Sequence, residues 1–579
     1  MSAPVRLPIL PPRTSVPAAQ DCNVPATPEA PHTMDFKDLR TALAAIADAE
    51  AHDESCKAFK DLRAAAFAAI ADDEAHGEFC KAFVENDDRE VAEVVRYLIR
   101  TAPPPVVSVV LSVIRDAVGQ DCYADALRSA GLANYLDVPY TGTGAELTGE
   151  AEERYVLEVL RSKRLWRYEV PSSRSFVGRF EKAAESLLGV NHVHATVSGS
   201  AALQVALLAI GVGPGDEVIV PAVTWVGCAD AVILCGAVPV IAQVDDTLGV
   251  SVADVERNIT ERTRAVMAVS LFGAPCDLGP LRAVADRHGI ALLEDNAQAA
   301  GVSYRGRRLG SIGDVAAFST KFMKFIAAGD GGFLATNSDT LYQFAVLYTG
   351  GRTFPARKRA IAVGDRIMPA TGLRMNELTG AVALAQLERL DQLLGRLRAA
   401  RDLIFELAGP ARTYRRVLGN DPSGDAGWMT PLIFSDEDAC RAFVRAVRAR
   451  GIRHVTTSRE LFAGGEIEHC YAAMSADRYL ATTGAHWAAE FRAMIAHVGI
   501  DARSNPWSHS PGRDYPSGFM DESLALVRRI ALVQTNPRLE PVHCETIARA
   551  LAEADAECAG RYMLHGQEGD KEALTPSQV

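Results

Sequence analysis

The sequence predicts an α/β fold with a mainly parallel central sheet, preceded by an all-α region and followed by a smaller α/β domain. Two observations lead to this prediction. From Glu150 onward, short apolar runs rich in β-branched residues alternate with segments of helical spacing, which is typical of strands buried between helices. Before Glu150, alanine-rich segments combine strong helix formers with apolar residues at helical spacing.

The expected strands of the large domain are short and apolar. They lie at His194–Val197, Glu217–Pro221, Ala265–Leu271, Ala291–Glu294, Ala316–Ser319 and Gly332–Thr336. Helices are expected at Ser200–Ile210 and Leu278–His288, and one long helix is expected over Glu377–Leu407. After that helix, Trp428–Ser435 and Arg529–Val533 are the strand candidates of the smaller domain.

The N-terminal region contains an internal repeat. The sequence that begins at Phe36 returns at Phe59, with an offset of 23 residues at the start and 24 by the cysteine. Two copies are too few for a solenoid, so we expect a small helical bundle. The repeated His52 and His76 have mainly acidic neighbours and no second ligand at zinc spacing, so we expect a solvated helix face and no metal site.

Composition divides the chain into six segments. They are a disordered lead (1–33), a helical domain with the tandem repeat (34–134), a linker (135–149), a large domain (150–400), a small C-terminal domain (401–560) and a disordered tail (561–579).

Charge and cysteine usage narrow the class of protein. A chain of 579 residues with a net charge of −13 is unlike a general nucleic-acid binder, which needs a basic face. No apolar run reaches the about 20 residues that span a bilayer, and the N-terminus lacks the apolar segment of a secretory signal. The 11 cysteines include no C-x-x-C pair, which is typical of reduced thiols. We therefore expect a cytoplasmic protein with no membrane or nucleic-acid partner.

A turn of small residues, Ser198-Gly199-Ser200, follows the first expected strand and opens a helix. Small residues let backbone N–H groups approach an anion, and the helix N-terminus favours negative charge. The alternative is an ordinary tight turn without a ligand.

Asp295 is expected where a buried strand meets the loop at its carboxyl end, which is where α/β folds place ligands. A carboxylate buried there needs a cationic partner, and a protonated pyridine nitrogen is one. The alternative is that Asp295 caps the N-terminus of a helix.

Lys324 is surrounded in sequence by the apolar residues Phe322, Met323, Phe325 and Ile326. Desolvation disfavours an ammonium group, and the neutral amine condenses with an aldehyde. The alternative is an exposed lysine at a strand end.

Together and in this order, the three motifs resemble the DegT/DnrJ/StrS-type family of sugar and aminocyclitol aminotransferases, over residues 150–555. Further matches at consistent spacing are Phe180-Glu181, Val197–Leu203, Gly213–Pro221, Pro239-Val240, Gly310–Asp314 and Gly329–Gly332. The resemblance implies the fold type I of pyridoxal 5'-phosphate (PLP) enzymes, which is the aspartate-aminotransferase-like fold. It also implies PLP as the cofactor of the large domain.

The resemblance implies two catalytic residues. Lys324 would form the Schiff base with PLP, because it lies five residues after Ser319 and five before Gly329, whereas Lys321 is too close to Ser319. Asp295 would pair with the pyridine nitrogen and keep it protonated.

Other cofactor contacts are implied in the same way. Gln298 would bond the phenolic oxygen of the cofactor, and Trp225 would stack on its ring, although a tryptophan alone is more often a core residue. The residues that would hold the phosphate are Ser198, Gly199, Ser200 and Ser319.

One segment departs from the family pattern. Where the family has an Asn that reaches the phosphate of the neighbouring subunit's cofactor, this chain has Gly372. The resemblance still implies a homodimer with shared active sites, but either that contact is lost or another residue replaces it. In the same segment, Arg374 is a candidate substrate-binding residue.

Retention of Lys324, where sugar-dehydrating members carry histidine, favours transamination. The expected reaction is a ping-pong transfer from glutamate or glutamine to a keto sugar or keto cyclitol, in amino-sugar or secondary-metabolite biosynthesis. The alternatives are a PLP-dependent dehydratase or eliminase, and a non-enzymatic PLP-binding regulator whose helical region contacts a partner. We expect the N-terminal helical region to be structural, with a protein partner as the alternative.

Overall fold

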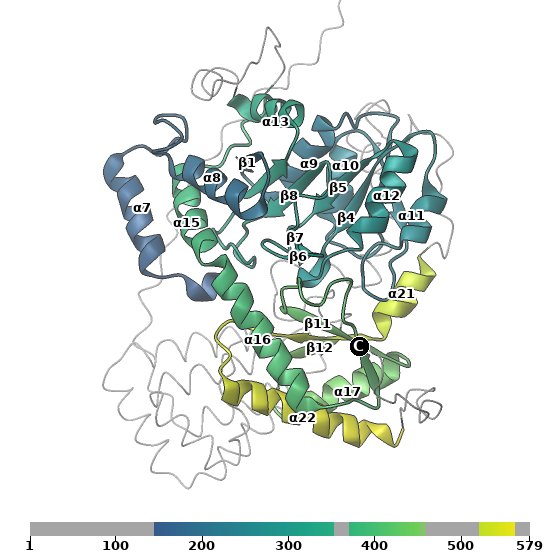
Figure 1. Cartoon of the computed structure of the whole chain (residues 1–579). Coiled ribbons are helices and arrows are strands. Elements are labelled where there is room, and N and C mark those ends of the chain that lie inside the picture. The colour runs from purple at the N-terminus through teal and green to yellow at the C-terminus, as the bar shows by residue number, and fades with distance from the viewer. Residues whose placement is uncertain (1–143, 352–369, 453, 458–519, 562–579) are drawn as a thin grey trace, which may run out of the picture. The chain divides into compact units, whose positions relative to one another are not determined.

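The computed structural model describes residues 144–351, 370–452, 454–457 and 520–561, all within one compact unit (Figure 1). The predicted lead, the helical domain with its repeat, the predicted linker up to residue 143 and the predicted tail after residue 561 lie outside the described residues.

The described residues contain a seven-stranded sheet with the strand order β1-β9-β8-β5-β4-β2-β3. Its strands are β1 (His192–Thr196), β2 (Glu217–Pro221), β3 (Val238–Ala242), β4 (Thr263–Val269), β5 (Ala291–Asp295), β8 (Val315–Ser319) and β9 (Gly332–Thr336). Within this sheet β9 runs antiparallel to its neighbours β1 and β8, and the other pairs are parallel. This arrangement confirms the predicted α/β fold with a mainly parallel sheet.

Helices pack against this sheet because its strands are apolar on both faces. Every residue of β2, β3, β8 and β9 is buried, so both faces must be covered. The covering elements are α8 (Phe176–Leu188), α9 (Gly199–Ala209), α10 (Gly227–Leu234), α11 (Val252–Asn258), α12 (Leu278–His288) and α13 (Asp339–Val346). Short elements between them are the 3-10 turns η2 (Ala145–Leu147) and η3 (Leu271–Gly273), the π-helical turn η4 (Leu347–Gly351), and the hairpin of β6 (Ser303–Tyr304) and β7 (Arg307–Arg308).

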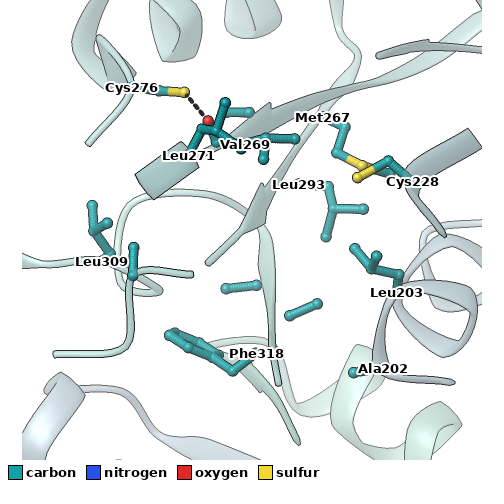
Figure 2. Close-up of a cluster of buried hydrophobic side chains, with 14 of the residues drawn as sticks. Ala202, Leu203, Cys228, Met267, Val269, Leu271, Cys276, Leu293, Leu309 and Phe318 are labelled. Carbon is teal, nitrogen blue, oxygen red and sulfur yellow. Dashed lines mark hydrogen bonds between the residues drawn. The ribbon is translucent and has the colours of Figure 1, made fainter. Parts of the chain in front are cut away.

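The core of this domain is filled by aliphatic side chains, some of which Figure 2 shows with Phe318, and by further aromatic rings. Phe318 of β8 stacks on Phe333 of β9, with ring centroids 4.4 Å apart. Phe180 of α8 meets Phe333 edge to face at 5.3 Å. These three rings hold α8 against the antiparallel pair of strands, from which the loops of the candidate site emerge.

A second sheet has four antiparallel strands in the order β10-β11-β13-β12. They are β10 (Tyr414–Arg416), β11 (Met429–Phe434), β12 (Val455–Thr457) and β13 (Ile530–Gln534). The neighbouring helices are α16 (Leu390–Ala408), α17 (Glu437–Ala449), α21 (Asp521–Arg528) and α22 (Pro541–Ala559). Buried side chains from α16, α17 and α22 form a separate apolar cluster with this sheet, as expected of a smaller α/β domain.

The prediction of one long helix over Glu377–Leu407 is wrong. The structure has two helices, α15 (Glu377–Glu388) and α16, separated at Arg389, whose backbone (φ −112°, ψ 9°) leaves the helical region. At this break the Arg389 guanidinium pairs with Glu152 of α7 (Glu150–Ser162), and Gln386 donates to the same carboxylate at 2.8 Å. The break between α15 and α16 thus lies where Gln386 and Arg389 both contact Glu152 of α7, more than 200 residues earlier in the chain.

Within the described ranges, no helix is both long and apolar enough to cross a membrane.

Candidate active site

The predicted site residues gather at the carboxyl edge of the large sheet. Asp295 ends β5 and Ser319 ends β8, while Trp225 follows β2. Because parallel strands deliver their carboxyl ends to one edge, residues far apart in sequence meet there.

Ser198 begins the anion site that the sequence predicts. Its side chain caps α9 and accepts a hydrogen bond from the Ala201 N–H at 3.0 Å. Gly199 packs so closely on the end of β8 that a Cβ at this position would lie 2.8 Å from Cβ of Ser319. The turn therefore brings Ser198, Gly199 and Ser319 together at a helix N-terminus, an arrangement that favours an anion.

Gly332 also allows the close approach of these segments. A Cβ added at Gly332 would lie 2.6 Å from the Gly199 nitrogen, the Phe318 carbonyl oxygen and the Ser198 carbonyl carbon. All three are main-chain atoms, so they cannot rotate away.

Substitution of Gly332 by alanine is therefore expected to destabilise the protein by about 1–3 kcal/mol and to weaken phosphate-group binding at the turn, because overpacking displaces the backbone. Urea unfolding and titration with PLP would measure the two effects. Gly213→Ala is the matched control, because nothing lies within 4 Å of an added Cβ there. Equal effects of the two substitutions would contradict the role of Gly332.

Asp295 is buried, with 4% of its surface exposed, and is followed by a turn and not by a helix. The alternative prediction that it caps a helix is therefore wrong. One carboxylate oxygen, Oδ1, accepts from the Ala297 N–H at 3.0 Å, and Oδ2 accepts from Sγ of Cys228 at 3.1 Å.

Burial raises the pKa of the Asp295 carboxyl, because it disfavours the charged form. The two hydrogen bonds and the charge of Lys324 act in the opposite direction and lower this pKa. The carboxylate and the predicted reactive lysine are thus close enough to interact electrostatically.

Glu294, beside Asp295, has a structural role that the sequence did not indicate. Its carboxylate is fully buried and accepts hydrogen bonds from the N–H groups of Gly310, Ile312 and Gly313 at 2.6, 2.9 and 2.6 Å. The two neighbouring carboxylates therefore have different roles. Glu294 holds the Gly310–Asp314 loop, and Asp295 lies at the candidate site.

Lys324 lies on the loop between β8 and β9. Main-chain hydrogen bonds close this loop, from Thr320 N–H to the Gly331 carbonyl (3.0 Å) and from Ala328 N–H to the Thr320 carbonyl (2.8 Å). The predicted apolar surroundings are only partly correct: Phe325 and Ile326 are buried, whereas Phe322 is 46% exposed.

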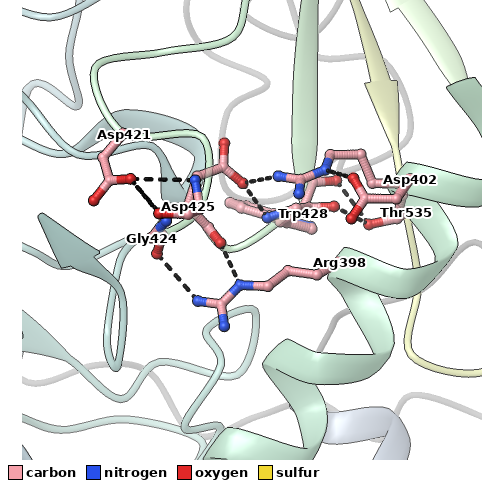
Figure 3. A network of polar contacts seen from close by, with 10 residues as sticks. Arg398, Asp402, Asp421, Gly424, Asp425, Trp428 and Thr535 are labelled. Atoms are coloured by element: carbon pink, nitrogen blue, oxygen red, sulfur yellow. Dashed lines mark hydrogen bonds and ion pairs between the residues drawn. The ribbon is translucent and has the colours of Figure 1, made fainter. Parts of the chain in front are cut away.

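The segment Asp421–Trp428, just before β11, contacts this loop and is itself held by a network of polar contacts, which Figure 3 shows. Arg398 of α16 donates to the carbonyl groups of Asp425 and Gly424 at 2.6 and 3.1 Å. Trp428 then meets Phe325 edge to face, with ring centroids 5.6 Å apart. The residue next to Lys324 is thus packed against a segment that is fixed by hydrogen bonds.

Trp225 is half-buried beside Gly227, where an added Cβ would lie 2.7 Å from its ring. The same Cβ would lie 3.4 Å from Oγ of Ser200, so Trp225 and Ser200 are neighbours. The Lys321 ammonium lies 5.7 Å from the centroid of the Trp225 ring. The two predicted cofactor residues are therefore brought together, with Lys321 beside them.

Gln298 and Arg374 both contact the main chain. Oε1 of Gln298 accepts from the Phe272 N–H at 3.1 Å. The Arg374 guanidinium donates to the Gly350 carbonyl at 3.2 Å and lies 6.0 Å from the centroid of the Trp166 ring. The predicted cofactor contact of Gln298 and the predicted substrate contact of Arg374 stay predictions.

Glu181, in the Phe180-Glu181 segment that matches the family, holds β1 in place. Glu181 is buried, accepts from the Ala195 N–H at 2.8 Å, and forms an ion pair with the buried Arg167. β1 leads directly into the Ser198 turn. The ion pair of Glu181 with Arg167 therefore helps to position that turn by holding β1.

The site residues and the fold define the class of protein. Residues 147–460 match the model of the DegT/DnrJ/EryC1/StrS aminotransferase family, and the chain belongs to this family. The match confirms the predicted family and shows that the protein is an aminotransferase.

Two curated relatives show the range of similar proteins. The chain is 40% identical over 261 residues to GDP-perosamine synthase of Caulobacter vibrioides, covering 45% of this chain and 67% of that protein. It is also 40% identical over 277 residues to L-glutamine:2-deoxy-scyllo-inosose aminotransferase of Streptoalloteichus tenebrarius, covering 44% of this chain and 65% of that protein.

Solved structures share the fold. DesV of S. venezuelae is 25% identical with a TM-score of 0.54, over 75% of this chain and 96% of that one. The aminotransferase from Psychrobacter cryohalolentis is 21% identical with a TM-score of 0.57, over 72% of this chain and 100% of that one. These similarities confirm the predicted aminotransferase fold.

Proposed function

We propose that this aminotransferase uses PLP and transfers an amino group from glutamate or glutamine to a keto sugar or keto cyclitol by a ping-pong mechanism. The observation that carries the proposal is Asp295, a carboxylate buried at the end of β5 within electrostatic reach of Lys324. A buried carboxylate requires a cationic partner, and the protonated ring nitrogen of PLP supplies one.

The residues of the chain fit this cofactor. When bound, PLP supplies an aromatic ring that accepts electrons from the substrate. Asp295 would keep the ring nitrogen protonated, and Trp225 would lie against the ring. Gln298 would bond its phenolic oxygen, and the turn of Ser198, Gly199 and Ser200, with Ser319, would hold its phosphate.

Lys324 has two tasks in this proposal. Its Nζ would hold the cofactor through the cofactor's aldehyde group, and the same nitrogen would accept and return a proton during amino transfer. The sequence also allowed a dehydratase or eliminase with the same cofactor, but the aminotransferase family and retention of the lysine favour amino transfer. The aminotransferase family argues against a purely regulatory role.

The nature of the acceptor is supported by the two relatives. One is named for a GDP-linked product and the other for L-glutamine and 2-deoxy-scyllo-inosose, at the same 40% identity. We therefore propose a keto sugar, including a nucleotide-linked one, or a keto cyclitol as acceptor.

The half-reaction tests this proposal. The protein purified with PLP is expected to show a visible absorbance band, which disappears when glutamate or glutamine is added without acceptor. One equivalent of the matching keto acid should appear, because the amino group stays on the enzyme. An eliminase that stays in the PLP form would release no such equivalent, and a protein that binds no PLP would contradict the proposal.

The remaining predictions concern organisation. We propose the domain boundaries given above, a homodimer whose two subunits share the active sites, and a cytoplasmic location. Light scattering would test the dimer, and limited proteolysis would test the boundaries near residues 150 and 400.

A further inference from the structure

A row of three polar side chains runs from the segment after β2 to the carboxylate of Asp295. Oγ1 of Thr224 lies 3.1 Å from Sγ of Cys228, and Sγ of Cys228 lies 3.1 Å from Oδ2 of Asp295. The Cys228 side chain is fully buried, and Thr224 is 2% exposed. Figure 2 shows Cys228 among the apolar side chains of Met267 and Leu293.

The direction of these hydrogen bonds follows from counting protons. Burial and the nearby charge of Asp295 raise the pKa of the Cys228 thiol well above its usual value, so the thiol stays protonated. Its single proton is donated to Oδ2 of Asp295. The Thr224 hydroxyl must therefore donate to the sulfur, and the row is ordered from Thr224 through Cys228 to Asp295.

We propose that Cys228 is a positioning residue, which holds the Asp295 carboxylate ionised and aligned with the pyridine nitrogen of the cofactor, and that Thr224 orients the thiol. This inference rests on the proposed function. Without the thiol, Oδ2 loses its donor, while Oδ1 keeps the bond from the Ala297 N–H. The carboxylate could then turn about the bond that remains.

Loss of the Cys228 thiol is expected to raise the pKa of the Asp295 carboxyl. Its hydrogen bond lowers the pKa of the Asp295 carboxyl, as does the charge of Lys324, so removing the bond raises that pKa. Asp230, which follows in α10, adds a further negative charge near the thiol. With PLP bound, a more basic carboxylate would hold the shared proton closer to itself, and the smaller positive charge on the ring would let the Lys324 nitrogen keep its own proton to a higher pH.

Two substitutions, Cys228→Ala and Cys228→Ser, distinguish the effect of the lost hydrogen bond to Asp295 from the effect of altered packing. In the full-length protein loaded with PLP, Cys228→Ala is expected to weaken PLP affinity about tenfold, the effect of losing one hydrogen bond to a charged group. It should also move the pH midpoint of the visible band upward. Cys228→Ser restores a donor and should recover most of both properties. Thr224→Val should shift the midpoint in the same direction, by less.

Cys276→Ala is the matched control. Cys276 is a buried cysteine of the same apolar cluster, and its thiol donates to the Val269 carbonyl at 2.8 Å (Figure 2). It should lose stability without a change in the pH midpoint. An unchanged midpoint and affinity in Cys228→Ala, or equal changes in Cys276→Ala, would overturn the inference and leave the proposed function intact. A wild-type protein that binds no PLP would overturn both.

Discussion

Replacing Lys324 with alanine is expected to lower amino transfer by at least about 10⁴-fold, because both the covalent link and the proton-transfer group are lost. The visible absorbance band should be absent from this variant even at saturating PLP. Single-turnover measurement with glutamate and glutamine would give the rate, and reduction with borohydride followed by peptide mapping would identify the labelled residue.

Lys321→Ala is the matched control for this prediction. Lys321 lies on the same loop, with its ammonium 5.7 Å from the Trp225 ring centroid. Its loss removes a charge beside the ring but not the proposed link, so the visible band should persist. If borohydride labelled Lys321, the assignment of Lys324 would be wrong.

Replacing Glu181 with glutamine is expected to reduce the free energy of unfolding by about 3–5 kcal/mol, because it leaves the buried Arg167 guanidinium without its carboxylate partner. Glutamine keeps the size of the side chain and an oxygen for the Ala195 N–H, so the loss would measure the charge. Urea unfolding would give the free energy. PLP affinity should fall too, since Ala195 lies on β1, just before the Ser198 turn.

Glu185→Gln, one turn later in α8, provides the comparison. Glu185 pairs with Lys182, whose side chain is largely exposed, and exposed pairs contribute about 0–1 kcal/mol. The double variant Glu181→Gln/Arg167→Met should recover part of the lost stability, because it removes both charges. Similar losses in Glu181→Gln and Glu185→Gln would contradict the anchoring role.

Most strands of the large sheet could be predicted because each is a short apolar run that can be recognised from its own residues. Glu217–Pro221 and Gly332–Thr336 are continuous apolar runs, and the structure has strands with the same bounds. Asp295 was predicted at a strand end for the same reason. The break at Arg389 was not predicted, since no glycine or proline marks it and its side-chain tie is to Glu152 of α7.

The contacts that complete the site could not be predicted. Cys228 is one of several scattered cysteines in the sequence, and its bond to Asp295 spans 67 residues. The role of Glu294 likewise depends on a loop 16 to 19 residues later. Such hydrogen bonds depend on the order of the strands in the sheet. This order cannot be predicted from any local pattern of residues.

The contact between Trp428 and Phe325 links the loop of Lys324, the proposed reactive lysine, to a segment more than 100 residues later in the chain. Arg398 and Arg401 of α16 fasten Asp425, the Thr535 hydroxyl donates to the Gly427 carbonyl at 2.5 Å, and Trp428 meets the neighbour of Lys324. The loop that carries Lys324 is therefore held by the segment before β11 as well as by the two strands that flank it. A substitution in α16, or at Thr535 just after β13, is therefore expected to change the reactivity proposed for Lys324 as well as stability.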